Sequence, residues 1–224
     1  MPIYKTKNED FFKKWSSEMA YVLGFFTADG NMTKHKNGGC YIEFTSNDYE
    51  VLYKIKKIIG LDNKISWRNR NSKIHYRIQM GSKVLYEDLI SLGLTPNKSL
   101  TIKFPNISLV HLKHFIRGYF DGDGCVYFKQ NWAKDRGKFR WVFQVRFTSG
   151  SKQFLEVFHS LLKDLKICKG GYLYHKNRGY ELVFSHYDGL ALFRFLYDNV
   201  SAEMYLERKY DIFQRAFKVL HLGT

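Results

Sequence analysis

A short segment occurs twice in this chain, and the duplication limits the possible folds more than any other feature of the sequence. The first copy, residues 19–30, reads MAYVLGFFTADG, and the second, residues 113–124, reads KHFIRGYFDGDG. Their alignment superimposes a glycine, a phenylalanine and a final Asp-Gly pair. A repeat separated by the length of a small domain predicts two similar halves. We place them at residues 1–105 and 106–224.

The same order of secondary-structure elements follows each copy. Strands with alternating polarity come first, and the second strand of each set ends in Phe-Thr-Ser, at residues 44–46 and 147–149. For the first half we then expect a helix at 49–60, strands at 64–70 and 74–80, and a helix at 83–92. For the second half we expect a helix at 152–166, strands at 171–175 and 180–185, and a helix at 189–199, with a longer hairpin within 127–140. The sequence therefore predicts an α+β chain with two similar halves.

Each copy of the repeat reads as a helix that ends at its last glycine. Ser16 or Ser17 is a candidate N-cap for the first helix, and Ser108 for the second, because a serine hydroxyl can accept a hydrogen bond from a free backbone N–H of the first turn. Gly30 and Gly124 stand where a left-handed C-terminal residue is expected. The Asp-Gly pair then marks an abrupt helix end in both halves.

Small residues stand four apart on one face of each predicted helix: Gly24 and Ala28 in the first, Gly118 and Gly122 in the second. By analogy with small-residue contacts between membrane helices, such faces let two helix backbones approach closely. Packing the two helices on these faces brings Asp29 and Asp123 side by side at the same end. An isolated Asp-Gly is usually an ordinary turn, but the paired occurrence favours a common site.

Two carboxylates at neighbouring helix C-termini are unfavourable in a bare protein. The helix dipole places partial negative charge there, and the carboxylates also repel each other. A hard divalent cation would offset both effects, with ligands from the Asp29 and Asp123 side chains and from the backbone carbonyls of Ala28 and Gly122. Mg²⁺ bound in this way, with Mn²⁺ as a substitute, suits the hydrolysis of phosphodiesters.

The charge balance indicates a polyanionic partner. The chain has 36 Lys and Arg against 21 Asp and Glu, a net charge of +15. Nucleic acid is favoured over a membrane, because no apolar run approaches the roughly 18 residues that a spanning helix needs. Residues 1–15 are charged and unlike a signal peptide, so we expect a soluble intracellular protein. The three cysteines form no CxxC pair, which predicts neither a zinc site nor a disulfide framework.

Both copies resemble the motifs of the LAGLIDADG homing endonucleases, in their monomeric two-motif form. The resemblance covers nearly the whole chain, including the order of the elements. It implies two αββαββα halves around a pseudo-two-fold axis, whose sheets form a saddle in the major groove of double-stranded DNA. It also implies that Asp29 and Asp123 bind the metal, and that one monomer cuts both strands at a long asymmetric target, as in intron homing. A bacterial cytoplasm and a mitochondrion or chloroplast both fit such a protein.

Four further positions are informative against the family pattern. Thr27 stands where the fuller motif has a carboxylate, as Asp121 does in the second copy. That position is usually structural, so we expect activity to survive the difference. Ser46 and Ser149 stand where the family often has a glutamine near the active site. By that resemblance they are possible active-site polar residues, which could act through water.

Two lysines match the place of a basic residue near the metals in the family. By the resemblance, Lys98 and Lys209 are catalytic candidates that could stabilise charge on the scissile phosphate or orient the attacking water. The alternative for both is a solvated cation on a loop. Arg208, next to Lys209, strengthens that alternative for the second lysine.

Strand alternation separates a face for the core from a face for DNA. The residues expected to face the core are Ile65, Trp67, Ile74, Tyr76, Ile78, Met80, Phe139, Trp141, Phe143, Val145 and Phe147. The residues expected to contact DNA are Tyr41, Glu43, Arg68, Arg70, His75, Arg77, Gln79, Tyr127, Lys129, Asn131, Lys138, Arg140, Gln144, Arg146, Tyr172, Tyr174, Lys176 and Arg178. This second set is rich in side chains that bind phosphates and read base edges, and Glu43 could accept from a cytosine amino group. A half-polar sheet that only faces water is the alternative.

Three other functions stay open on the sequence alone. An intron RNA maturase and a non-catalytic DNA-binding protein can both have the same fold, and a generic basic RNA-binding module would have the same charge. Retention of both Asp29 and Asp123 favours the nuclease, since neither splicing assistance nor DNA binding requires the metal ligands. The RNA-binding module is disfavoured because no single-strand or double-strand RNA motif is recognisable.

Overall fold

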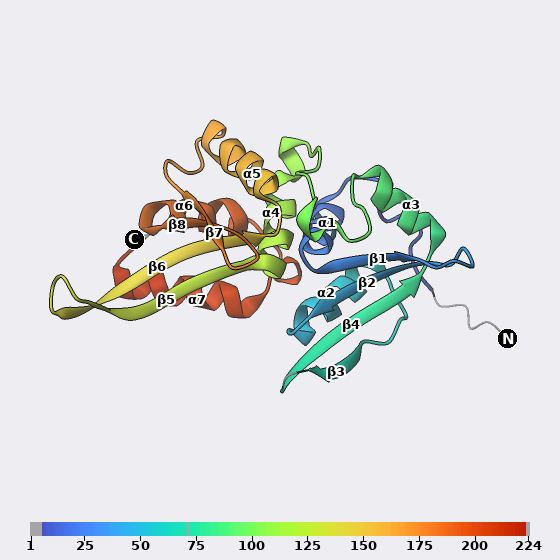
Figure 1. Cartoon of the computed structure of the whole chain (residues 1–224), viewed down its shortest axis with the longest axis horizontal. Coiled ribbons are helices and arrows are strands. Elements are labelled where there is room, and N and C mark those ends of the chain that lie inside the picture. Colours follow the sequence, from blue (N-terminus) through green and yellow to red (C-terminus); the bar gives the residue numbers. More distant parts are fainter. Residues whose placement is uncertain (1–5, 71, 223–224) are drawn as a thin grey trace.

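The computed structural model describes residues 6–70 and 72–222, which form two similar halves side by side (Figure 1). The first half consists of α1 (Ser17–Asp29), β1 (Gly30–Lys34), β2 (Cys40–Ser46), α2 (Tyr49–Ile59), β3 (Ser66–Arg70), β4 (Lys73–Gly81), α3 (Lys83–Ser91) and the 3₁₀ turn η1 (Lys98–Leu100). The second half consists of α4 (Leu109–Asp123), β5 (Gly124–Ala133), β6 (Lys138–Ser149), α5 (Lys152–Asp164), β7 (Tyr172–Lys176), β8 (Gly179–Ser185), α6 (His186–Tyr197), the 3₁₀ turn η2 (Ala202–Met204) and α7 (Glu207–Leu220). The predicted α+β fold with two αββαββα halves is confirmed.

Each half contains one antiparallel sheet of four strands. The strand orders are β1-β2-β4-β3 and β5-β6-β8-β7, so the two sheets have the same topology. Their registers correspond as well: Gly30 pairs with Phe44 in the first sheet, and Gly124 pairs with Phe147 in the second. The sequence repeat is therefore a structural repeat, strand by strand.

The helices α1 and α4 lie against each other between the two sheets (Figure 1). Their contact depends on two glycines. A Cβ atom on Gly24 would overlap the backbone oxygen of Phe115 and lie 2.9 Å from the nitrogen of Tyr119. A Cβ atom on Gly118 would overlap the backbone oxygen of Tyr21 in the same way. The small-residue faces expected from the sequence do form the contact, and they bring backbone against backbone.

The expected left-handed conformation at the two helix ends is wrong. Gly30 has φ −91° and ψ 151°, and Gly124 has φ −91° and ψ 157°, which is extended backbone. Each glycine is the first residue of the following strand, so the chain passes from helix to strand without a reversing turn. Glycine is required there by close packing, because a Cβ atom at either position would overlap the ring of Phe26 or Phe120.

The two helix starts differ in their capping. The Ser16 hydroxyl accepts a hydrogen bond from the backbone nitrogen of Met19 at 3.1 Å, so Ser16 is the side-chain cap of α1. Ser108 occupies the N-cap position of α4 but makes no side-chain capping bond. The Ser17 hydroxyl instead contacts Nε2 of His114 at 3.1 Å, which links the two central helices at their N-terminal ends.

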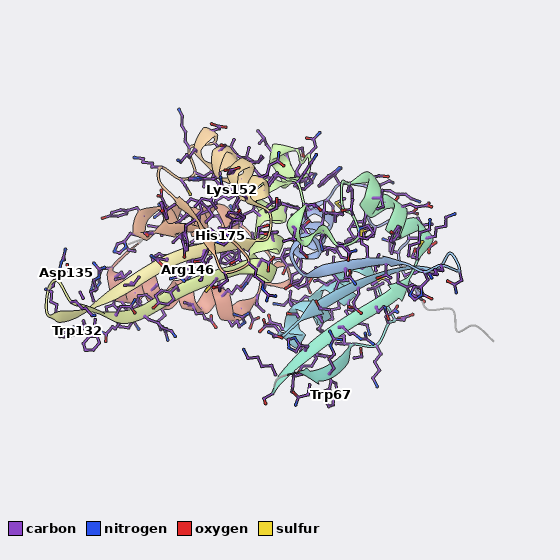
Figure 2. All side chains as sticks on the ribbon, in the orientation of Figure 1. Trp67, Trp132, Asp135, Arg146, Lys152 and His175 are labelled. Carbon is purple, nitrogen blue, oxygen red and sulfur yellow. The ribbon has the colours of Figure 1, made fainter. Side chains whose placement is uncertain are left out.

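The expected division of the strands into core and outer faces holds only where helices cover the sheet. Phe143, Val145 and Phe147 are buried, as are Ile78 and Met80. The core assignment is wrong for four residues at the outer ends of the strands: Trp67, Ile74, Phe139 and Trp141, of which Trp67 is 68% and Phe139 63% exposed. Figure 2 shows Trp67 at the lower end of the first sheet and Trp132 near the tip of the β5–β6 hairpin, past the helices.

One helix was absent from the sequence expectations. The last helix expected from the sequence was the one at 189–199, but residues Glu207–Leu220 form a further helix, α7. Phe213 and Phe217 of this helix are buried against Phe143 of β6, and Phe213 also contacts Phe120 of α4. The apolar residues recur at helical spacing, which was the available signal.

Across residues 6–70 and 72–222, none of the helices combines the length and apolar character needed to cross a membrane. The three cysteines are free thiols, two of them buried.

Candidate active site and DNA-facing surface

The structure brings Asp29 and Asp123 together at the C-terminal ends of α1 and α4. The last turns of the helices abut: a Cβ atom on Gly122 would overlap the Cβ of Ala28 and lie 3.3 Å from Oδ2 of Asp29. The pairing of small residues therefore determines how close the two helix ends come. The arrangement expected from the sequence repeat is present in the fold.

Burial disfavours the charged form of both carboxyl groups, and repulsion by Asp29 acts in the same direction on Asp123. Burial raises the pKa of Asp29 to about 6, although the cations Lys209 and Lys98 act in the opposite direction. Burial and the nearby Asp29 charge together raise the pKa of Asp123 to about 7, although Lys209 and Lys98 act in the opposite direction. Groups with such shifted pKa values are frequent at functional sites. The pair would be stabilised in its charged form by a bound cation.

The two candidate lysines are buried beside these carboxylates. Lys209 is only 2% exposed, and its Nζ donates to the backbone oxygens of Phe120, Asp121 and Gly124 at 2.5, 2.8 and 2.7 Å. Lys98 is 6% exposed, and its Nζ donates to the backbone oxygen of Gly30. Neither side chain is a solvated loop cation, so that alternative is excluded.

Each lysine satisfies the carbonyl end of one central helix. Lys209 lies at the end of α4 and Lys98 at the end of α1. Burial lowers the pKa of Lys98 to about 8, while the Asp123 and Asp29 carboxylates act to raise it. Burial lowers the pKa of Lys209 to about 8, against the attraction of Asp121. Two carboxylates and two ammonium groups thus form a compact, nearly charge-balanced cluster.

Thr27 and Asp121 occupy equivalent positions but make different contacts. The Thr27 hydroxyl donates to the backbone oxygen of Leu23 at 2.8 Å. Oδ2 of Asp121 accepts from the Tyr21 hydroxyl at 2.7 Å and from the backbone nitrogen of Leu206 at 3.0 Å. Asp121 therefore ties α4 to α1 and to the segment before α7, which agrees with a structural role for this position.

Ser46 and Ser149 lie at equivalent turns. The Ser46 hydroxyl accepts from the backbone nitrogen of Asp48 at 3.0 Å, and the Ser149 hydroxyl accepts from that of Ser151 at 3.1 Å. These bonds order the loops that follow β2 and β6. A part for either serine in the active site stays a prediction.

The donor set fits a hard cation that takes most of its ligands from elsewhere. Within the described part of the chain, no three His, Cys, Asp or Glu side chains come together as a metal cluster. Asp29 and Asp123 could supply two carboxylates, and the adjoining helix ends could supply carbonyl oxygens. Mg²⁺ is commonly held by one or two carboxylates together with water and phosphate oxygens. The residues present are therefore compatible with a divalent cation that is completed by the substrate.

The residues expected to contact DNA lie on or beside the outer faces of the two sheets. Cross-strand partners share a face, and Tyr127 pairs with Gln144 while Asn131 pairs with Arg140. The exposed members of the set are Tyr41, Arg68, Gln79, Lys129, Asn131, Lys138, Arg140, Tyr172, Lys176 and Arg178. The partly buried members are Glu43, His75, Arg77, Tyr127, Gln144, Arg146 and Tyr174. The side chain of Arg70 lies outside the described residues.

An acid–base pair occupies equivalent positions in both sheets, with the charges exchanged. In the first sheet Glu43 of β2 pairs with Arg77 of β4 at 3.4 Å. In the second sheet Arg146 of β6 pairs with Glu181 of β8 at 3.8 Å. The sequence reasoning missed Glu181, which is also bound by Lys176 at 2.9 Å. The two halves therefore have the same backbone fold, but the acidic and basic residues of this pair are on opposite strands in the two sheets.

The comparison with known proteins identifies the family. A family model described as the LAGLIDADG-like domain matches residues 16–91 and again residues 111–195. The chain belongs to this family. The first match contains Asp29 and the second contains Asp123. The chain is therefore a two-motif LAGLIDADG protein.

Solved structures of this family have the same fold. The I-SmaMI LAGLIDADG homing endonuclease bound to cleaved DNA is similar with a TM-score of 0.60 and 15% identity, over 93% of this chain and 91% of that one. The I-LtrWI LAGLIDADG homing endonuclease bound to target DNA has a TM-score of 0.59 and 15% identity, over 96% and 92%. At this level of identity the comparison extends to the fold alone.

Curated relatives match only in part. A probable translation initiation factor IF-2 of Methanocaldococcus jannaschii is 31% identical over 135 residues, which is 58% of this chain but 11% of that protein. An uncharacterized protein of the same organism is 30% identical over 132 residues, 56% of this chain and 44% of that protein. This chain thus spans less than half the length of either relative.

Proposed function

We propose that this protein is a metal-dependent endonuclease that cuts both strands of double-stranded DNA at one long, asymmetric site. The observation that carries the proposal is the central cluster: one partly buried carboxylate and one buried lysine at each of two abutting helix ends. Such a duplicated centre suits two equivalent reactions on the two antiparallel strands. The exposed basic side chains of the sheets and the DNA-bound solved relatives support duplex DNA as the substrate.

In this proposal the chain's own residues have separate parts. Asp29 and Asp123 hold a divalent cation, Mg²⁺ or Mn²⁺, with carbonyl oxygens of Ala28 and Gly122 as further ligands. The cation when bound supplies Lewis acidity and lowers the pKa of a coordinated water. Lys98 and Lys209 balance the carboxylate charge and present ammonium groups that can stabilise the scissile phosphate or orient water. We propose that one monomer carries both sites.

The direct test is a selection of cleaved sites from a randomised duplex library in the presence of Mg²⁺. We expect one long site, different in its two halves, because the outer faces differ in charge at equivalent positions such as Glu43 and Arg146. The recovered ends identify the cut positions in each strand. If the protein binds DNA but cuts none with Mg²⁺ or Mn²⁺, it is a non-catalytic DNA-binding protein and the nuclease proposal fails.

Binding to the selected duplex is expected to weaken steeply with salt. With a net charge of +15 and contacts to about six to ten phosphates, affinity should fall by roughly 10³- to 10⁵-fold between 50 and 200 mM salt. Fluorescence anisotropy in Ca²⁺ with an uncut duplex measures this slope. Lys129→Ala and Arg140→Ala, on the exposed hairpin, should each lower the slope, and a flat response would contradict a phosphate-binding sheet surface.

A further inference from the structure

The lysine at the end of α4 depends on a segment that also contacts the first half of the chain. Lys209 lies in the first turn of α7, and its neighbour Arg208 reaches across to the loop after β2. Arg208 Nε and Nη2 donate to Oδ1 and Oδ2 of Asp48, both at 2.7 Å. This two-point geometry restrains orientation as well as distance.

A second contact across the halves joins α2 to the residues around the start of α7. Nζ of Lys54 in α2 donates to the backbone oxygen of Tyr205 at 2.9 Å and lies 3.9 Å from the carboxylate of Glu207. The backbone just before and at the start of α7 is therefore attached to α2 of the first half. Together with the Arg208–Asp48 contact, they attach the residues just before Lys209 to the first half.

The role of Asp48 differs from that of its counterpart in the second half. Asp48 is the N-cap residue of α2, a position where aspartate usually accepts a backbone hydrogen bond, but it makes no side-chain capping bond. Its counterpart Ser151 does cap α5, by accepting from the backbone nitrogen of Phe154 at 3.3 Å. The Asp48 carboxylate accepts from Arg208 instead. The loop therefore lacks the capping bond to α2 and has an ion pair with the second half in its place.

The other lysine has the reciprocal arrangement. Lys98 begins the turn η1, and the next residues of that turn lie against the loop after β6 of the second half. A Cβ atom on Gly150 would overlap the backbone oxygen of Ser99 and lie 3.0 Å from Cδ2 of Leu100. The contact near Lys98 is therefore a close steric packing, whereas the contact near Lys209 is an ion pair.

We infer that each buried lysine is held in place by the strand-to-helix loop of the opposite half, to which the helix α2 after that loop adds a contact on the side of Lys209. Asp48 and Lys54 position Lys209, and Gly150 positions Lys98. All three are positioning residues, since none of them contacts the reacting groups. The catalytic consequence rests on the proposed nuclease function: each lysine serves one strand, so a defect in one loop slows the cutting of one strand.

The placement of the lysines can be measured without cleavage, by acylation of lysine amines followed by mass spectrometry. In the wild-type protein both Lys98 and Lys209 should react slowly, with exposed lysines as internal references. Asp48→Asn should increase labelling of Lys209 by up to about 5-fold, the upper end of what an exposed ion pair contributes, and leave Lys98 unchanged. Gly150→Ala should increase labelling of Lys98 and leave Lys209 unchanged. Equal changes at both lysines, or none, would overturn the inference.

The charge exchange Asp48→Arg with Arg208→Asp should restore slow labelling of Lys209, which a general loss of stability would not do. Glu156→Gln is the matched control, because it removes an exposed ion pair with Lys152 at 2.9 Å within α5. It should leave both lysines unchanged. Failure of the exchange to restore protection counts against the Asp48–Arg208 contact as the cause.

Strand-specific cleavage completes the test on an end-labelled duplex. Asp48→Asn and Gly150→Ala should each accumulate a nicked product, with opposite strands left uncut, and Glu156→Gln should accumulate neither. If labelling changes as expected but the wild type cuts no DNA, the nuclease proposal fails and the positioning stands. If the wild type cuts and both variants slow both strands equally, the positioning inference fails and the nuclease stands.

Discussion

Replacement of either motif aspartate by asparagine should abolish cleavage and stabilise the metal-free protein. For Asp29→Asn and Asp123→Asn we expect the rate of strand cleavage to fall by roughly 10³-fold or more, because a metal ligand at the reacting phosphate is lost. Asparagine keeps the shape of the side chain, so binding of the duplex should persist. Linearisation of a plasmid with one target site measures the rate.

The effect on stability follows from the pKa shifts. Burial raises the pKa of Asp123 to about 7, against an ordinary value of 3.8 in the unfolded chain. Between these two pH values the folded state binds the proton more tightly than the unfolded chain, so stability falls as pH rises through this window. Above it the full cost of burying the charge is present. Asparagine removes that cost, and we expect the free energy of unfolding at pH 8 in EDTA to increase by about 2 kcal/mol.

Metal binding links the cleavage rate to the stability of the protein. Mg²⁺ should raise the melting temperature of the wild type, because it binds the folded state, and should raise that of either variant much less. Asp10→Asn is the control, since this residue is exposed and pairs only with Lys13 among the described ion pairs; its cleavage should match the wild type, and its stability should change by less than about 1 kcal/mol. The prediction is wrong if both aspartate variants are less stable than the wild type in EDTA at pH 8.

Much of the fold and the central pair of aspartates were predictable because both depend on local pattern. A helix of period 3.6 that ends in Asp-Gly, repeated once with the same elements after it, places Asp29 and Asp123 at equivalent helix ends. The close approach of the helices followed from the size of Gly24 and Gly118 alone. These inferences need no knowledge of which distant segment covers which face.

The errors arose where distant segments decide the environment. Alternation places Trp67 and Phe139 on the core side of their strands, but cannot tell that the covering helices end before these residues. The burial of Lys209 requires carbonyl groups of Phe120 and Gly124, which lie more than eighty residues away along the chain. Glu181 was missed for the same reason, since its pairing with Arg146 depends on the contact of β6 with β8.

Replacement of Gly118 by alanine should destabilise the protein, although alanine is the better helix former. The intrinsic preference favours alanine over glycine by about 1 kcal/mol in a helix interior. In the structure, however, the new methyl group would overlap the backbone oxygen of Tyr21 and lie 2.8 Å from its carbonyl carbon. Backbone atoms of a packed helix cannot turn aside as a side chain can. We therefore expect a net loss of about 2 kcal/mol in the free energy of unfolding.

The same substitution should reduce cleavage beyond what stability explains. Relief of the overlap requires α1 and α4 to separate, which moves the helix ends that carry Asp29 and Asp123, and a displacement of ~1 Å can cost about 10²-fold in rate. Gly189→Ala in α6 is the matched comparison, because the nearest atoms to its methyl group are side-chain atoms, the ring of Phe143 at 2.8 Å and Cγ2 of Val145 at 3.3 Å. Chemical denaturation and cleavage under folding conditions should rank Gly118→Ala well below Gly189→Ala in both measurements. If Gly118→Ala is as stable and active as the wild type, the central helices are not held at the distance that places the two carboxylates together.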